Sequence, residues 1–303
     1  MKPSVARLVL ALSGCAIVLS GCAQKQTAMA TQHAAAAVKK VVTAPSGQRL
    51  PRPDHVIIIV EENHSRSGII GNREAPYMNE MAARGAVFTQ SYAITHPSAP
   101  NYSALFSGET NTNGDGCPAA GIDKTAPNLG SELIAVHYTF VGYSETMPRA
   151  GYEGCGYGFG HASYARKHNP WVNFSNVPPE SNQPLDALPP YERLPTVSFI
   201  VPNQAHDMHS SSIEDADDWL RARMKPLIDW AMTHNSLVIL TWDEDDRGEN
   251  NRIPTILLGP MVKPGTYGIR IDHYSVLRTI EDMYGLPHAG HSSEARTITE
   301  CWH

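Results

Sequence analysis

The sequence lacks several features that define large classes of protein. Among its 303 residues, no apolar run reaches the roughly 18 that a membrane-spanning helix needs, which argues against a polytopic membrane protein. Basic residues are not in excess, since the formal net charge is −6, and nucleic acid is not an expected partner. A Gly-x-Ser-x-Gly elbow, found in many serine esterases, is also missing. The 42% of hydrophobic residues are enough to bury a sizeable core.

The first residues have the pattern of an export signal. Lys2 and Arg7 precede an apolar stretch over residues 8–19, which has the length of a signal-peptide core. The stretch ends in Leu19-Ser20-Gly21-Cys22, which resembles the lipobox of bacterial lipoproteins and implies cleavage before Cys22 and lipidation of that residue. An ordinary signal peptide is the alternative. We therefore expect residues 1–21 to be removed and the protein to be exported and membrane-anchored in a bacterial cell envelope, at the periplasm or the cell surface.

The segment after the signal is expected to be a tether. Residues 22–53 are rich in Ala, Gln, Thr and Lys and carry no stripe of large apolar residues, so we expect a flexible tether followed by a single catalytic domain over 54–303. Export implies an oxidising compartment. Cys117 and Cys155 both lie in Gly-rich loops, and we expect these two to form a disulfide, with Cys301 left unpaired.

Strand and helix patterns alternate along this domain. Residues 55–60 form a continuous run dominated by β-branched residues, which is typical of a strand buried on both faces. The alternation predicts an α/β fold with a mostly parallel central sheet sandwiched by helices. The helix expected over 213–234 contains Pro226 and should be kinked or divided. Residues 108–194 have little periodicity and are expected to form an elaborate loop region at one edge. The other strands are expected over 86–92, 139–143, 196–201, 237–242 and 255–258, and the other helices over 77–84, 101–106, 129–136 and 273–284.

Polar side chains follow three of the expected strands directly. Glu62 and Asn63 follow the first strand, Asp243 and Glu244 follow the strand over 237–242, and a segment from Asn203 to His209 follows the strand over 196–201. In parallel sheets, these ends gather at one edge. Converging carboxylates are costly unless a cation lies among them, which predicts a divalent metal ion. Ordinary helix N-caps and solvated loop acids are the alternative.

A serine is placed to act beside such an ion. Ser98 follows the strand over 86–92 and stands two residues before Pro100, which suits the first turn of a helix. At a helix N-terminus, free backbone N–H groups and the dipole favour an anion such as phosphate. A serine hydroxyl needs a base or a metal to become a nucleophile. The alternative role for Ser98 is an N-cap.

Taken together, these segments resemble the bacterial phosphoesterase family of acid phosphatases and phospholipases C, within the alkaline phosphatase superfamily. The matching stretches run in the family's order over residues 55–287. They are Val60-Glu61-Glu62-Asn63-His64-Ser65, His96-Pro97-Ser98-Ala99-Pro100-Asn101-Tyr102, Arg166-Lys167-His168-Asn169-Pro170-Trp171, the segment 202–209, Thr241-Trp242-Asp243-Glu244-Asp245-Asp246, Ile253-Pro254-Thr255 and Asp272-His273-Tyr274-Ser275.

The resemblance implies roles for particular residues. Ser98 matches the nucleophile, and Asn101 matches an amide that steadies the phosphate in related enzymes. The implied metal ligands are Glu62, Asn63, Ser98, Asp243 and Glu244. Many superfamily members carry Asp-His where this chain has Asp243-Glu244, so the site is richer in oxygen and two zinc ions are not assumed; the metal stays open. Either His209 or His168 protonates the leaving alcohol. Further active-site candidates are Asn203, Asp207 and His273, the last with a structural role as its alternative.

The function that the resemblance implies is metal-dependent hydrolysis of phosphate monoesters through a phosphoserine intermediate at the cell envelope. The larger phospholipases of the family carry further C-terminal domains, whereas this chain ends soon after the helix over 273–284, and this favours a small phosphatase. One alternative is a phosphodiesterase or phospholipase C that acts on lipid headgroups. The other is a lipoprotein that binds a phosphorylated ligand without turning it over. The oligomeric state stays open.

Overall fold

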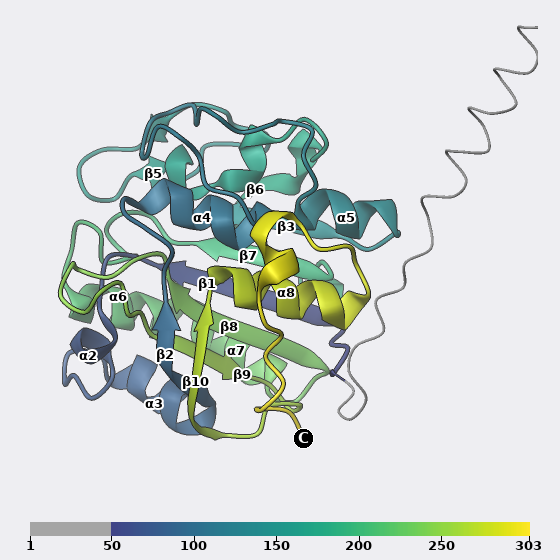
Figure 1. The fold of residues 1–303 in the computed structure, drawn as a ribbon. Coiled ribbons are helices and arrows are strands. Elements are labelled where there is room, and N and C mark those ends of the chain that lie inside the picture. The colour runs from purple at the N-terminus through teal and green to yellow at the C-terminus, as the bar shows by residue number, and fades with distance from the viewer. Residues whose placement is uncertain (1–49) are drawn as a thin grey trace, which may run out of the picture. The chain divides into compact units, whose positions relative to one another are not determined.

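The computed structural model describes residues 50–303. The expected signal peptide, the lipidation site Cys22 and nearly all of the expected tether lie outside these residues. The described part is built on an eight-stranded sheet in the order β10-β2-β9-β8-β1-β7-β3-β6 (Figure 1). The strands are β1 (His55–Glu61), β2 (Ala86–Tyr92), β3 (Phe140–Ser144), β6 (Asn182–Pro184), β7 (Val197–Val201), β8 (Ser236–Trp242), β9 (Thr255–Leu258) and β10 (Gly265–Asp272).

The sheet is mostly parallel, as expected. Strand β1 pairs in parallel with β7 on one side and with β8 on the other. Strand β3 continues this direction through β7 and β6, and β2 pairs in parallel with β10. Strand β9 alone runs the other way, because it pairs antiparallel with both β8 and β2. The fold is therefore the mixed α/β arrangement that the alternation predicts.

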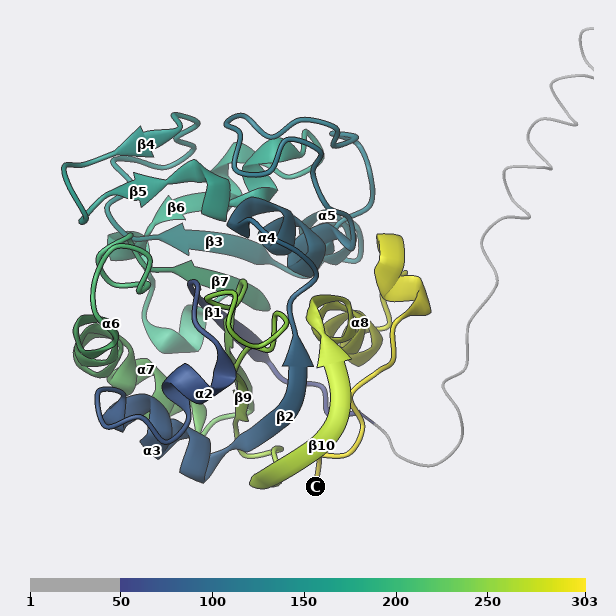
Figure 2. The same cartoon turned by 60° about the vertical axis from the view of Figure 1, so that its left-hand side comes forward.

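Helices cover both faces of the sheet (Figure 2). Alternate residues of β1 point to opposite faces, so Ile58 packs in one core with α4 (Ser98–Ser107), α5 (Leu129–Ala135) and α8 (His273–Tyr284). Ile57 and Ile59 pack in the other core with α3 (Pro76–Arg84), α6 (Ile213–Trp219) and α7 (Lys225–Ala231). Each fully buried Ile contributes roughly 1.5–3 kcal/mol. Burial on both faces explains the unbroken apolar run of β1.

The long helical segment near Pro226 is divided, as the proline predicts. Helix α6 passes into a π-helical turn over Leu220–Met224, and α7 begins with Pro226 in its first turn. There the missing proline N–H breaks no helical hydrogen bond. The helical segment ends at Ala231, three residues before the expected end.

Two strands of the sheet and a small hairpin were not expected from the sequence. Strand β10 lies at one edge and β6 at the other. Within the loop region over 108–194, β4 (Gly156–Tyr157) and β5 (Tyr164–Ala165) pair antiparallel as a separate hairpin. Cys117 and Cys155 form the expected disulfide, and Cys301 is free and buried. In the part of the chain that the structure describes, every helix is too short or too polar to cross a bilayer.

Candidate active site

The candidate site lies where the parallel strands end, and its residues come from four separate segments. Glu62 directly follows β1, and Asp243 and Glu244 directly follow β8. Asp207 lies in the loop after β7, and Ser98 is the first residue of α4, the helix after β2. The fold therefore brings together residues that are as much as 180 positions apart in the chain, as the hydrogen bond from the Asn63 N–H to Asp243 Oδ1 shows directly.

Glu62 is the centre of the cluster and is fully buried. Its Oε2 accepts hydrogen bonds from Ser98 Oγ at 3.0 Å and from Asn63 Nδ2 at 2.7 Å. Its Oε1 accepts one from the Tyr102 hydroxyl at 2.8 Å and lies 3.0 Å from His168 Nε2. Burial opposes ionisation, but the neighbouring His168 and Lys167 lower the pKa of Glu62 to about 2. Glu62 is therefore an anion with contacts on both of its oxygens.

Ser98 lies between two carboxylates. Its Oγ is 3.0 Å from Glu62 Oε2 and 3.2 Å from Glu244 Oε1, and the residue is buried. Because Ser98 begins α4, the unpaired N–H groups of the first helical turn lie beside it. One of these, the N–H of Ala99, donates to Asp115 Oδ1 at 3.0 Å. This N–H is therefore used by a side chain of the protein itself, and a phosphate at this helix N-terminus stays a prediction.

The acids after β8 complete this side of the cluster. Asp243 Oδ1 accepts a hydrogen bond from the backbone N–H of Asn63, and Asp243 Oδ2 is buried without a well-formed hydrogen bond. Burial, together with repulsion from Glu62 and Glu244, raises the pKa of Asp243 well above its usual range. Burial also raises the pKa of Glu244. A cation at this point would relieve the repulsion, and hard carboxylate oxygens are suitable ligands for it.

The opposite side of Glu62 carries a second group of possible ligands. Glu62, His168 and Asp207 are all buried, and they offer ligand atoms that lie within 4.8 Å of one another. Asp207 Oδ2 has only a long contact of 3.6 Å to His168 Nδ1, and burial raises the pKa of Asp207 well above its usual range. The ring of His168 stacks on Tyr102 with centroids 4.9 Å apart. Glu62 is therefore shared between two groups of residues that could hold a metal ion.

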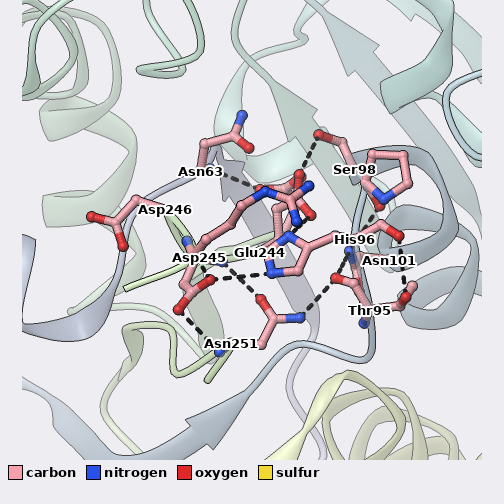
Figure 3. A network of polar contacts seen from close by, with 12 residues as sticks. Asn63, Thr95, His96, Ser98, Asn101, Glu244, Asp245, Asp246 and Asn251 are labelled. Atoms are coloured by element: carbon pink, nitrogen blue, oxygen red, sulfur yellow. Dashed lines mark hydrogen bonds and ion pairs between the residues drawn. The ribbon is translucent and has the colours of Figure 1, made fainter. Parts of the chain in front are cut away.

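His96 belongs to the site, although the sequence analysis gave it no role. Its Nδ1 contacts Glu244 Oε2, and its Nε2 lies 3.3 Å from Asp245 Oδ1 (Figure 3). Asp245 also accepts hydrogen bonds from three backbone N–H groups of its own loop. His96 stands only two residues before Ser98, and this spacing is the one feature of the sequence that indicates a place in the site. The ring holds the loop after β8 against the start of α4.

The contact with phosphate expected for Asn101 is not supported, because its side chain is fully hydrogen-bonded to the backbone of its own loop. Its Oδ1 accepts hydrogen bonds from the N–H groups of Ile94 and Thr95, both at 3.0 Å. Its Nδ2 donates to the carbonyl oxygens of Thr95 and Pro97. These contacts give no support to a direct contact with phosphate. Asn101 instead fixes the loop that carries Ser98, and we describe it as a positioning residue.

The remaining predicted residues lie around the cluster. His209 is exposed, and its Nε2 lies 3.4 Å from Lys167 Nζ, which donates to Asp115 Oδ2 at 2.6 Å. Asn203 shapes its own turn, accepting from the N–H of Ala205. His273 is buried outside the carboxylate cluster and contacts the backbone oxygen of Asp243 through Nε2 at 2.7 Å. This contact favours the structural alternative for His273.

Comparisons with known proteins agree with the fold. A protein of the alkaline phosphatase superfamily from Vibrio parahaemolyticus has a similar structure, with a TM-score of 0.58, 11% identity, and coverage of 88% of this chain and 76% of the other. A lipoteichoic acid synthase from Listeria monocytogenes gives a TM-score of 0.54 and 10% identity, with 77% and 72% covered. At this identity, the likeness concerns the fold, which is that of the alkaline phosphatase superfamily.

Sequence comparison defines the family more closely. The model of the Phosphoesterase family matches residues 72–287. A phosphatidylinositol-3-phosphatase of Mycobacterium tuberculosis is 48% identical over 270 residues, with 88% of each chain covered. A phosphate-repressible acid phosphatase of Penicillium chrysogenum is 32% identical, covering 70% of this chain and 55% of its own length. The chain therefore belongs to the Phosphoesterase family and is a phosphoric-ester hydrolase.

Proposed function

We propose that the protein hydrolyses phosphate monoesters with Ser98 as nucleophile, through a phosphoserine intermediate. The observation that carries this proposal is the position of Ser98 Oγ, 3.0 Å from Glu62 Oε2 and 3.2 Å from Glu244 Oε1, at the first residue of a helix. A hydroxyl held between two carboxylates can lose its proton to one of them. The helix N-terminus beside it favours the phosphate group.

The residues present fit a divalent metal ion. Asp243 Oδ2 is buried without a well-formed hydrogen bond, and three carboxylates repel one another around Ser98. Glu62, Asn63, Asp243 and Glu244 would hold the ion together with Ser98. Such an ion supplies charge neutralisation and lowers the pKa of the serine hydroxyl. The oxygen-rich set favours a hard cation, and the identity of the ion stays open.

The protein's own groups supply the remaining chemistry. Ser98 Oγ attacks phosphorus in line with the leaving alcohol, and negative charge on the phosphoryl oxygens is stabilised by Lys167 and by the positive end of the α4 dipole. Of the two candidate acids, His209 is exposed and close to Lys167, whereas His168 is buried against Glu62. His209 is therefore better placed to protonate a departing alcohol. Water then hydrolyses the phosphoserine and releases phosphate and Ser98.

For the substrate, we propose phosphate monoesters that include phosphoinositide headgroups, because a relative that shares 48% of its residues is a phosphatidylinositol-3-phosphatase. The acid phosphatases among the relatives support the monoester class in general. We also propose export and a lipid anchor on Cys22, which rest on the N-terminal sequence pattern. Phosphodiester cleavage and ligand binding without turnover are the alternatives.

Replacement of the nucleophile tests the mechanism. Ser98→Ala should lower turnover of an aryl phosphate by a factor of about 10⁴ or more while the protein remains folded by circular dichroism. Ser107→Ala is a matched control, since it removes a buried serine from the last turn of the same helix. Wild-type protein quenched in acid during turnover should carry phosphate on Ser98 by mass spectrometry. Full activity of Ser98→Ala would end the proposal.

A substrate and metal panel separates the alternatives. The proposed enzyme should hydrolyse a mono-aryl phosphate much faster than a bis-aryl phosphate, whereas a diesterase should show the opposite preference. Chelation should abolish turnover, and readdition of a divalent ion should restore it. A protein that retains a stoichiometric ion and binds phosphate but turns over neither substrate would be a binding protein.

A further inference from the structure

The hairpin of β4 and β5 carries an aromatic residue that is almost fully exposed to solvent. Phe159, at the tip between the two strands, is 96% exposed. Tyr157 in β4 is 51% exposed, and Val136 at 47% is the only other large hydrophobic side chain of comparable exposure within residues 50–303. Gly158 and Gly160 on either side of Phe159 both have positive φ, a backbone conformation that glycine adopts without steric strain. Phe159 and Tyr157 therefore form an exposed aromatic pair on one small hairpin, and aromatic rings of this kind are suited to a membrane interface.

The same hairpin forms one wall of a cleft whose lining also includes Lys167 and Asp115, the latter bonded to the residue after Ser98. The cleft has a volume of about 460 Å³, and its lining includes Tyr157, Gly158 and Gly160 of the hairpin and Lys167 and Asp115 opposite them. Phe159 does not line it. Lys167 contacts Asp115, and Asp115 accepts the N–H of Ala99 beside Ser98. The tip thus borders a cleft that is connected to the start of α4 through Asp115.

The base of the hairpin is held firmly, although its tip is free. Cys155 forms the disulfide with Cys117 directly before β4. Ser163, directly before β5, bonds to Gln204 through its side chain at 3.0 Å and through its backbone oxygen at 3.1 Å. Residues 155–162 are all exposed. A fixed base with a projecting aromatic tip can enter a membrane interface without rearrangement of the core.

The charge of this segment suits an anionic lipid surface. In a chain with a net charge of −6, no acidic residue occurs between Glu153 and Glu180, a stretch that contains both Arg166 and Lys167. Lys167 pairs with Asp115 and Arg166 donates to the backbone oxygen of Glu153, so the feature that suits an anionic lipid surface is the lack of acidic groups, which such a surface would repel. Aromatic rings prefer the boundary between lipid headgroups and acyl chains. Figure 2 shows the hairpin at the periphery of the described residues, outside β6 and away from the helices that flank the sheet.

We propose that the tip of the β4–β5 hairpin, with Phe159 as its anchor, inserts into the lipid interface and presents membrane-borne phosphomonoester headgroups to the cleft. The proposal rests on the phosphomonoesterase function proposed above and specifies the form of its substrate. A lipid substrate would be bound at two points, by the cleft at the phosphate and by the tip at the bilayer. A soluble phosphate ester gains nothing from the tip, so the two substrates separate the contributions.

Phe159→Ser tests the proposal in the full chain carrying Cys22→Ser, so that an acyl anchor on Cys22 does not contribute. Turnover is measured on phosphatidylcholine vesicles that contain a long-chain phosphatidylinositol monophosphate, on a short-chain soluble form of the same headgroup, and on an aryl phosphate. We expect kcat/KM on vesicles to fall by roughly tenfold or more, the effect of one aromatic side chain leaving the interface. Both soluble substrates should be unaffected. Phe159→Trp should retain vesicle turnover, and Val136→Ser is the matched control for an exposed apolar residue elsewhere.

The outcomes distinguish this inference from the proposed function. Three results would overturn the inference alone. Phe159→Ser could lower turnover equally on vesicles and on soluble esters, or leave turnover on vesicles unchanged. Wild-type protein could also hydrolyse the soluble esters but not the vesicle lipid. Wild-type protein that hydrolyses no monoester would overturn the proposed function itself.

Discussion

Glu62 and Glu132 are both buried glutamates, but their surroundings are opposite. Glu62 has a hydroxyl, an amide, a phenol and an imidazole around its two oxygens, and its pKa is lowered to about 2 despite burial. Glu132, in α5, has no hydrogen-bond partner on either oxygen, and burial near Glu281 of α8 raises its pKa to about 8. The first group is kept charged by its neighbours. Glu132 instead stays buried as a neutral carboxyl group, because it retains its proton.

The difference shows what distinguishes a site from a merely buried acid. Burial alone raises the pKa of a carboxyl group, and this applies equally to both regions. Only around Glu62 do several acids from different segments converge together with basic groups and a serine at a helix N-terminus. Converging acids with buried, poorly bonded oxygens such as Asp243 Oδ2 and Asp207 Oδ2 favour a cation. At α5 and α8, by contrast, protonation of the carboxyl groups relieves the repulsion.

Among changes that compare these two regions, the largest effect is expected for Asp243→Asn, which removes a carboxylate from the cluster around Glu62. Activity on an aryl phosphate should fall by a factor of about 10³, because a proposed metal ligand is lost. Thermal unfolding in the presence of a chelator should instead occur at a higher temperature than in wild-type protein, because repulsion from Glu62 and Glu244 is relieved. Asp246→Asn is the control, since Asp246 is in the same acidic run but is exposed and turned away from His96 (Figure 3). A chelated variant less stable than wild type would contradict this account.

A smaller effect is expected for Asn101→Ala, which tests the corrected role of this amide. Loss of its four bonds to the backbone over 94–97 should lower kcat by roughly 10- to 100-fold, since a small displacement of the nucleophile is enough. Inhibition by inorganic phosphate should change little if Asn101 only positions Ser98. Steady-state kinetics with phosphate as inhibitor measures both quantities. Unchanged kcat with clearly weaker phosphate inhibition would show that Asn101 contacts phosphate after all.

The smallest effect on activity is expected for Glu132→Gln, which replaces the buried carboxyl group with the raised pKa, away from the site. The pKa of about 8 in the folded protein lies above the ~4.3 of an unfolded glutamate, so the bound proton stabilises the fold fully below about pH 4. This stabilisation is lost as the pH rises through 8. The glutamine variant should therefore gain roughly 4 kcal/mol over wild type between about pH 5 and pH 8, with unchanged turnover. Urea unfolding at several pH values measures this, and the exposed Glu294→Gln should show no such trend.

Much of the fold could be predicted from the sequence because its central elements are buried. Strands β1, β7 and β8 are buried almost throughout and mostly apolar, and their runs stand out from the flanking polar loops. The acids that follow them then had to gather at one edge of a parallel sheet, which is how Glu62, Asp207 and Asp243 were found together. Ser98 was found because a proline two residues later indicated the start of a helix.

The features that the sequence did not predict depend on tertiary contacts. Strand β10 is mostly exposed at the edge of the sheet, so its sequence Gly-Thr-Tyr-Gly-Ile-Arg-Ile-Asp carries no clear apolar pattern. The reversed direction of β9 cannot be read from a short apolar run, which is the same in either direction. Asn101 lies at the expected place, but the partners of its amide were set by a loop whose path depends on His96, Glu244 and Asn251.

The reversed strand β9 has a consequence for how such a protein can change in length. Because β8 and β9 are adjacent and antiparallel, residues 243–254 form the loop that connects two fixed strands. Asn251 in this loop donates a hydrogen bond to the backbone oxygen of Thr95. An insertion here would pull Asp243 and Glu244 out of register with Ser98. The exposed tip of the β4–β5 hairpin, over residues 158–162, has no comparable constraint, so growth and diversification of the chain are more easily accommodated there than beside the acids.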